Sequence, residues 1–113
     1  MAFKNPTPII QNLAPKDNPY NFKDSLSAFG NPYTDFSQGD YSGQAMVFKE
    51  PSKYGLDGGN ISRLNIKYKG KPILMYDRGW DTRTGTGIAP EHKEFYDALV
   101  KALSEHGKGR TDY

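Results

Sequence analysis

Apolar and polar positions alternate most regularly in the segment 61–68, which reads ISRLNIKY. Apolar side chains fall at nearly every second position there, so an extended chain places them on one face and the polar ones on the other. This pattern predicts a strand with one buried and one wet face. The turn-forming dipeptide KG separates it from a second apolar run at 72–77, so we expect the two segments to form an antiparallel hairpin.

A third apolar run, AMVF, lies in the segment 42–50 and ends shortly before a proline. It has the length and composition of a strand. The residues that follow, PSKYGLDGG, are turn formers, and their three glycines can adopt positive φ angles. The sequence thus predicts a small antiparallel sheet of about three strands, with a turn at 51–59 between the first strand and the second.

The spacing of the apolar residues changes to a helical period in the segment 90–106. A proline and a glutamate open it, and both suit the first turn of a helix. One apolar stripe is formed by Phe95, Leu99, Ala102 and Leu103. Gly107 suits the position just past a helix end, so residues 107–113 are expected to form a flexible tail. Because this helix can cover the apolar face of the sheet, we predict an α+β domain over residues 41–106.

Residues 1–40 differ from the rest of the chain because they hold most of its prolines and show no clear strand alternation. Two Asn-Pro-Tyr turns place Tyr20 and Tyr33 in this segment. Between them, apolar residues at i, i+4 and i+7 favour a short helix near 24–29. We interpret 1–40 as an extended, proline- and tyrosine-rich arm that either docks on the domain's own sheet or orders on a partner.

Composition limits the possible chemistry. The 113 residues include no cysteine, which excludes a disulfide scaffold, a thiolate metal site and a cysteine nucleophile. No apolar run reaches the roughly 20 residues of a membrane helix and no signal peptide opens the chain, so we expect a soluble, cytoplasmic protein. The two histidines stand near opposite ends of the predicted helix and cannot share a metal ion within one chain. We therefore predict no catalytic residue, no metal site and no cofactor.

The densest polar and aromatic cluster is the segment 76–81, YDRGWD, which contains the only tryptophan. One interpretation is a strand end at which the indole covers the core and the arginine forms a local ion pair. The other rests on the fact that Tyr, Trp and Arg are the commonest anchors of protein interfaces. On that interpretation, a partner-binding surface is formed by Tyr76, Arg78 and Trp80 with Tyr20 and Tyr33 of the arm.

A second candidate surface is basic. The net charge of +2 is too small to imply nucleic-acid binding by itself, but the predicted hairpin 63–71 carries four cations and no acidic residue. With its tyrosine as a stacking ring, this region could bind nucleic acid through Arg63, Lys67, Lys69, Lys71 and Arg83. The plain alternative is that these cations only form the solvated face of a strand.

The glycine-rich turn at 55–59 invites comparison with phosphate-binding loops. It lacks the spacing of either common nucleotide-binding motif, and a strand rather than a helix follows it. We interpret it as a structural turn. A small-ligand site or weak enzyme built on this turn and Asp77 is a third hypothesis.

Two motifs, YGLDGGNISRL at 54–64 and MYDRGWD at 75–81, resemble those of a family of short uncharacterised proteins from phages, plasmids and integrative elements of Gram-positive bacteria. The resemblance covers roughly residues 45–81, and the chain departs from the family pattern at Leu56, Asn60 and Met75. No activity is established for that family. The resemblance therefore implies a mobile genetic element as the source, and it implies no reaction.

These observations lead to two hypotheses from different classes. The first is a non-enzymatic accessory protein of a phage or mobile element that binds and inhibits or modulates a host protein. A defence-system effector is the expected target, in an anti-CRISPR-like or other counter-defence role. The alternative is a small nucleic-acid-binding accessory protein that uses the basic hairpin 63–71.

Overall fold

The computed structural model of the protein describes residues 18–81 and 85–113. Five strands, two short 3-10 helices and one α-helix follow one another along that part of the chain. The elements are β1 (Lys23–Leu26), β2 (Pro32–Gln38), β3 (Tyr41–Val47), η2 (Leu56–Gly58), β4 (Ile61–Tyr68), β5 (Lys71–Asp77), η3 (Pro90–His92) and α1 (Lys93–Lys108).

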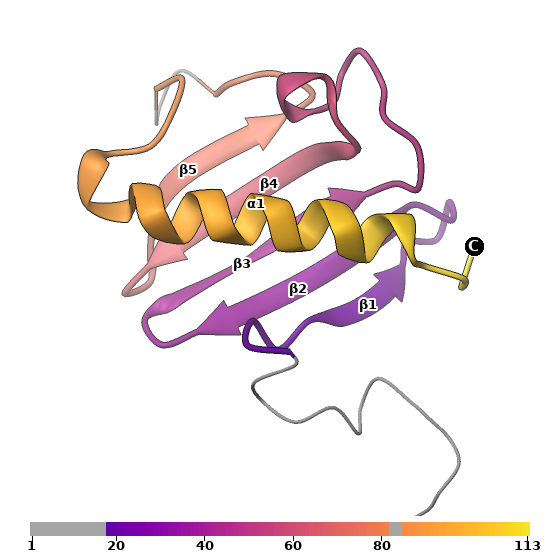
Figure 1. The fold of residues 1–113 in the computed structure, drawn as a ribbon, viewed down its shortest axis with the longest axis horizontal. Coiled ribbons are helices and arrows are strands. Elements are labelled where there is room, and N and C mark those ends of the chain that lie inside the picture. The colour runs from indigo at the N-terminus through magenta and orange to yellow at the C-terminus, as the bar shows by residue number, and fades with distance from the viewer. Residues whose placement is uncertain (1–17, 82–84) are drawn as a thin grey trace, which may run out of the picture.

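The five strands form one sheet in sequence order, and every neighbouring pair is antiparallel. Helix α1 lies across one face of this sheet, with η3 leading into it (Figure 1). A sheet with a covering C-terminal helix was expected, but the prediction of about three strands is wrong. The strands predicted at 42–50, 61–68 and 72–77 are β3, β4 and β5.

The two additional strands, β1 and β2, lie in the segment predicted to be an extended arm. The short helix predicted near 24–29 is also wrong, because β1 ends at Leu26 and a turn follows it. All four residues of β1 are exposed, so no alternation marks this edge strand. In β2 the buried positions are Pro32, Thr34 and Phe36, and a proline and a threonine do not register as an apolar pattern. Residues 1–17 of the predicted arm lie outside the described residues.

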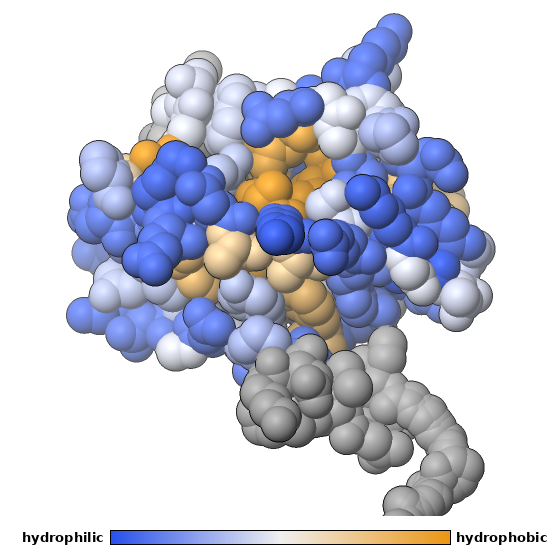
Figure 2. Space-filling model, in the orientation of Figure 1, coloured by the Kyte–Doolittle hydropathy of each residue, from blue (hydrophilic) through white to orange (hydrophobic). Residues whose placement is uncertain are grey.

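The core lies between the sheet and α1. Leu99 and Leu103 of the helix are fully buried, while hydrophilic residues cover its outer side, as the space-filling view from the helix side shows (Figure 2). The strands contribute buried apolar side chains from one face only: Phe36, Ala45, Val47, Ile61, Leu64, Ile66, Leu74 and Tyr76. Alternation in each strand therefore leaves a second set of side chains on the face away from the helix.

The residues after α1 pack against the sheet, where a flexible tail over 107–113 was expected. Gly107 lies inside the helix rather than after it, and it is buried. The guanidinium of Arg110 is buried and donates hydrogen bonds to the main-chain oxygens of Tyr33 and Ser25 at 2.8 and 3.2 Å. Asp24 of β1 accepts hydrogen bonds from Thr34 at 2.7 Å and from His106 at 2.8 Å. The edge strand and the C-terminal residues thus hold each other in place.

Replacing Asp24 with asparagine will flatten the acid limb of the stability curve. Burial raises the pKa of Asp24, but hydrogen bonds from His106 and Thr34 and the charge of Arg110 outweigh burial and hold this pKa below its usual value. A carboxyl with a lowered pKa stabilises the fold above its unfolded pKa, and that contribution is lost as the pH falls through the folded pKa. Wild-type free energy of unfolding, measured by urea denaturation, will therefore fall below about pH 4. The asparagine variant will be less stable at neutral pH and will show a shallower fall, and parallel curves would contradict this role.

Candidate functional site

The face of the sheet opposite α1, called the open face below, carries a continuous row of side chains across all five strands. The strand register places these residues side by side: Ser25, Tyr33, Met46, Arg63 and Asp77. Their chain neighbours Thr34, Ala45, Leu64 and Tyr76 are buried against the helix, so the row faces away from it. A cation, an anion and an aromatic ring thus meet on one surface.

Arg63 is the centre of this row. Its guanidinium donates a hydrogen bond to Asp77 Oδ2 at 2.8 Å and another to the Tyr33 hydroxyl at 3.2 Å. The hydrogen bond to Asp77 raises the pKa of the Arg63 guanidinium further above its usual value, and burial acts in the opposite direction. Arg63 therefore stays charged, and residues of β5 and β2 fix its position.

The chain turns sharply just after Asp77. An isolated bridge pairs Tyr76 with Trp80, and the amide of Arg78 donates to the main-chain oxygen of Ser62 at 2.8 Å. Arg78 has a φ angle of 57°, in the left-handed region that non-glycine residues seldom occupy. Its side chain is 67% exposed, and its Nε lies 3.8 Å from Asp77 Oδ1. The turn therefore presents a second guanidinium beside the same carboxylate.

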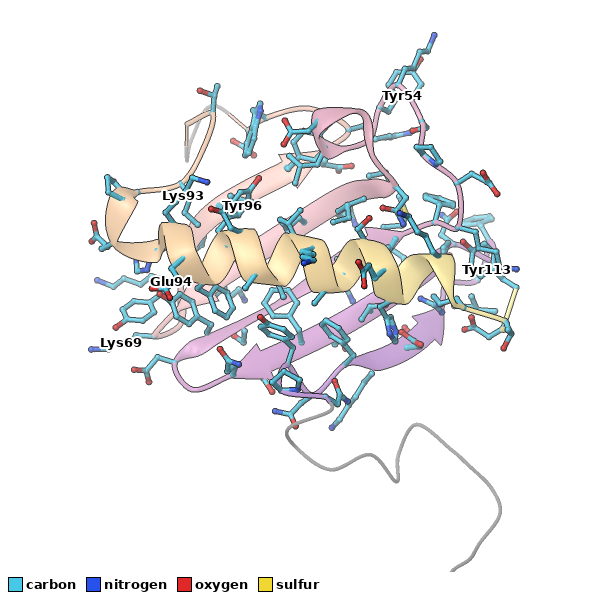
Figure 3. All side chains as sticks on the ribbon, viewed as in Figure 1. Tyr54, Lys69, Lys93, Glu94, Tyr96 and Tyr113 are labelled. Carbon is cyan, nitrogen blue, oxygen red and sulfur yellow. The ribbon has the colours of Figure 1, made fainter. Side chains whose placement is uncertain are left out.

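A hollow of about 440 Å³ opens at this end of the open face. Arg63, Asp77 and Arg78 form its charged side, and Tyr33 lines it as well. Its other lining residues come from the β1–β2 turn, the end of β3 and the loop that follows: Asn31, Met46, Phe48, Ser52 and Tyr54. Figure 3 shows Tyr54 projecting outward from that loop. The hollow therefore joins a charged side to an apolar and aromatic side.

Ser62 also lines the hollow. It is only 5% exposed, and its Oγ has no hydrogen-bond partner among the described residues. The register between β3 and β4 shifts at Val47, which pairs with Ile61 while Met46 pairs with Arg63. Ser62 is therefore the extra residue of a β-bulge, a feature that often re-aims side chains near functional sites.

The structure separates the residues that were predicted to form one partner-binding surface. Arg78 and Tyr33 line the hollow. Tyr76 points toward the helix and is buried, with its hydroxyl donating to the main-chain oxygen of Tyr54 at 2.8 Å. Trp80 packs edge-on against Tyr76 with ring centroids 5.1 Å apart. Tyr20 is buried on the helix side, where it stacks on a neighbouring phenylalanine.

The basic residues of the alternative surface are also separated. Arg63 belongs to the hollow, whereas Lys67 lies further along β4 on the open face. Lys69 occupies the turn between β4 and β5 with a φ angle of 51°, and Lys71 begins β5. Figure 3 shows Lys69 at the end of the molecule opposite Tyr54. Arg83 lies outside the described residues.

The glycine-rich turn at 55–59 folds on itself. The amides of Gly58 and Gly59 donate to the main-chain oxygens of Gly55 and Leu56 at 2.9 and 3.0 Å. These amides are therefore used within the turn rather than directed at a ligand. Asp77, the other part of the small-ligand hypothesis, is paired with Arg63.

Sequence reasoning missed the contributions of Ser62, Met46 and Phe48. No pattern marks a buried serine in a bulge, because the bulge depends on the partner strand. The alternation of β2 could have placed Tyr33 on the wet face if that strand had been recognised. The position of Arg78 beside Asp77 is the part of the site that the YDRGWD motif did indicate.

The family model for a domain of unknown function, DUF7678, matches residues 32–106. The chain belongs to this family. The matched region runs from β2 into α1 and includes Tyr33, Ser62, Arg63, Asp77 and Arg78, whereas β1 and Arg110 lie outside it. No curated protein and no solved structure matches the chain.

Family membership agrees with the resemblance to an uncharacterised family, and it assigns no activity. Within the part of the chain that the structure describes, no helix has the length and apolar character needed to cross a membrane.

Proposed function

We propose that the protein is a non-enzymatic binding module that engages another protein through the open face. The observation that carries this proposal is that α1 covers one face of the sheet only. The other face presents an ordered row of tyrosine, methionine, arginine and aspartate beside a hollow. Arginine and tyrosine in a partly apolar hollow are typical anchors of a protein interface.

The charge pattern favours a protein partner over a nucleic acid. Arg63 and Arg78 lie beside Asp77, and in the neighbouring row the strand register places Lys23 opposite Asp35. A surface of alternating sign suits a protein partner of complementary pattern, whereas a nucleic acid favours a continuous positive surface.

The source and the target extend this proposal. The motifs at 54–64 and 75–81 support an origin in a phage or other mobile element of Gram-positive bacteria. On that basis we infer an accessory protein that acts in the cytoplasm of the bacterial host and inhibits or modulates a host protein. A defence-system effector is the target we propose, by analogy with the counter-defence role of many small proteins of such elements.

Nucleic-acid binding is the second candidate. The observation in its favour is the exposure of Lys67, Lys69 and Lys71 around the β4–β5 turn. No ion pair joins these three lysines to an acid within the described ranges 18–81 and 85–113. Their distance from the hollow lets the two candidates be tested separately.

Capture from host lysate will distinguish the two surfaces. The full chain is compared with an Arg63→Ala, Arg78→Ala double variant and with a matched Lys67→Ala, Lys69→Ala control. We expect the wild type and the lysine control to retain one host protein after nuclease treatment, and the arginine variant to lose at least about 90% of it, as loss of interface anchors implies. Equal retention by all three proteins would contradict the choice of surface. Loss in the lysine variant alone, together with nuclease sensitivity, would support nucleic-acid binding instead.

A further inference from the structure

We propose that the hollow on the open face binds a carboxylate, and that in the cell this carboxylate is an acidic side chain of the partner protein next to an apolar residue. This inference rests on the proposed binding function and names the chemistry of its contact. It follows from five features of the hollow: an excess of guanidinium groups, unused hydrogen-bond donors, a buried hydroxyl without a partner among the described residues, the backbone conformation of Arg78, and an adjacent apolar wall.

The charged side of the hollow holds more cations than anions. Arg63 and Arg78 both lie beside Asp77, which is the only acidic residue among the described residues that line the hollow. One carboxylate cannot neutralise two guanidinium groups. A second carboxylate would balance the charge, and guanidinium groups bind carboxylates in short, charge-assisted hydrogen bonds.

Beside this excess positive charge, several hydrogen-bond donors have no acceptor among the described residues. The Arg63 guanidinium has five N–H groups, and its hydrogen bonds within the described residues go to Asp77 and Tyr33. Because the Tyr33 hydroxyl accepts from Arg63, its own proton can be donated to a ligand. Among the described residues, the Arg78 side chain makes one ion-pair contact, a long one of 3.8 Å with Asp77, and most of the side chain is exposed.

Ser62 supplies an observation that is independent of charge. Its Oγ is buried at the hollow without a hydrogen-bond partner among the described residues, and such groups are rare because they lose the hydrogen bonds of water. A small side-chain movement would let this hydroxyl donate to an oxygen atom bound in the hollow. The unpaired hydroxyl thus points to a polar ligand rather than to an apolar one.

The backbone of Arg78 is held ready for such a contact. A φ angle of 57° is costly for arginine, and the bond from its amide to Ser62 helps to maintain it. A glycine, which would adopt this angle freely, stands one position later, at Gly79. The turn therefore fixes an arginine beside Asp77 at a position where another residue type would be less strained.

The apolar wall limits what accompanies the carboxylate. Met46 and Phe48 line the hollow next to the charged row, and the ring of Tyr54 is about half exposed at its rim. An acidic residue followed or preceded by an aromatic or aliphatic one would fill both parts.

Blocked tripeptides test the chemistry directly. The probes are acetyl-Phe-Glu-Phe-amide and its uncharged match acetyl-Phe-Gln-Phe-amide, titrated into the full chain and followed by the backbone amide signals of Ser62, Arg63 and Arg78 in two-dimensional NMR. We expect saturable shifts with the glutamate peptide and a dissociation constant at least about tenfold weaker for the glutamine peptide, as loss of a charge-assisted hydrogen bond implies.

Three variants should change the affinity for the glutamate peptide in different directions. Arg78→Gln should weaken binding of the glutamate peptide about tenfold, because it removes a charged donor. Asp77→Asn should strengthen it several-fold, because the competing internal carboxylate is lost. Lys67→Gln, on the same face but outside the hollow, is the matched control and should leave binding unchanged. A purely structural role for Asp77 would weaken binding in its variant, so the increase is diagnostic.

Each other outcome overturns the inference. Equal affinity for the two peptides would show that the hollow does not distinguish a carboxylate from an uncharged amide. Unchanged or weaker binding in Asp77→Asn would show that Asp77 does not compete with the ligand. Saturable binding of a short single-stranded oligonucleotide that Arg78→Gln abolishes, in the absence of peptide binding, would assign the hollow to phosphate. If capture of the lysate partner depends on the arginines but the peptides do not bind, the proposed function stands and this inference fails. If the peptides bind but no partner is captured, this inference stands and the proposed function fails.

Discussion

Replacing Gly43 with alanine will lower the free energy of unfolding by about 3 kcal/mol, at the upper end of the usual cost of overpacking. Gly43 lies in β3 between Phe36 of β2 and Ile66 of β4. An added Cβ would overlap the main-chain carbonyl oxygen of Asn65 and would lie 2.6 Å from Cζ of Phe36. Because that oxygen belongs to the backbone of a central strand, it cannot rotate aside, and the strands would have to separate in the middle of the sheet.

Gly87 offers the matched control for this substitution. An added Cβ at Gly87 meets no atom within 4 Å, and its φ angle does not require glycine. The Gly87→Ala protein should therefore differ from the wild type by no more than about 0.5 kcal/mol. Chemical denaturation of the three proteins measures both effects. Similar stability for Gly43→Ala and the wild type would mean that the sheet does not close around Gly43 as described.

Replacing Arg110 with alanine will cost about 3–4 kcal/mol, because it leaves a group of buried and half-buried acceptors without their cation. The Arg110 side chain is 1% exposed and lies 3.5 Å from Asp24, and it also forms an ion pair with Asp112. Its hydrogen bonds reach the main-chain oxygens of Ser25 and Tyr33 in two different strands. Without it, β1 loses its main link to the C-terminal residues.

Lysine will not restore this stability, since an ammonium group cannot reproduce the planar fork that reaches several oxygens at once. The matched control is Lys108→Ala, which removes an exposed cation from the same end of the helix and should change stability by no more than about 0.5 kcal/mol. Thermal unfolding followed by circular dichroism compares the proteins. An Arg110→Ala protein as stable as the Lys108→Ala protein would show that the buried network contributes nothing.

The sequence predicted the elements in which aliphatic residues recur with the period of a strand or a helix. The alternation in 61–68 is the strand β4, and the helical stripe of Leu99 and Leu103 faces the core. It did not predict β1 and β2, because contacts with neighbouring elements rather than their own residue pattern make these segments strands. β1 buries none of its four residues, and its place is set by pairing with β2 and by Arg110.

Gly107 shows the same limit in the helix. A glycine near a helix end is typical of the position past the last turn, and the sequence prediction followed that rule. The structure continues the helix to Lys108. Gly107 stands where an added Cβ would collide with Val47 and with the main-chain oxygen of Phe48. The glycine serves a close approach of helix and sheet, which no local pattern reveals.

The candidate site divides in the same way. The motif YDRGWD indicated Arg78, because a polar and aromatic cluster is visible in one short segment. Its partners Tyr33, Ser62 and Arg63 come from two other strands, and only the register of the sheet brings them to one end of the open face. The motif also suggested Tyr76, which the alternation of β5 directs into the core, and Tyr20 of the predicted arm is buried as well.

The pairing of β1 with the residues after α1 bears on where the domain can be cut. The family match begins at residue 32 and stops at residue 106, so a fragment with those limits lacks both β1 and Arg110. β2 would then become the margin of the sheet and offer unpaired main-chain groups to other chains. Because β1 is a short, charged edge strand and β2 is longer, truncation at the family boundaries would make the sheet more prone to self-association.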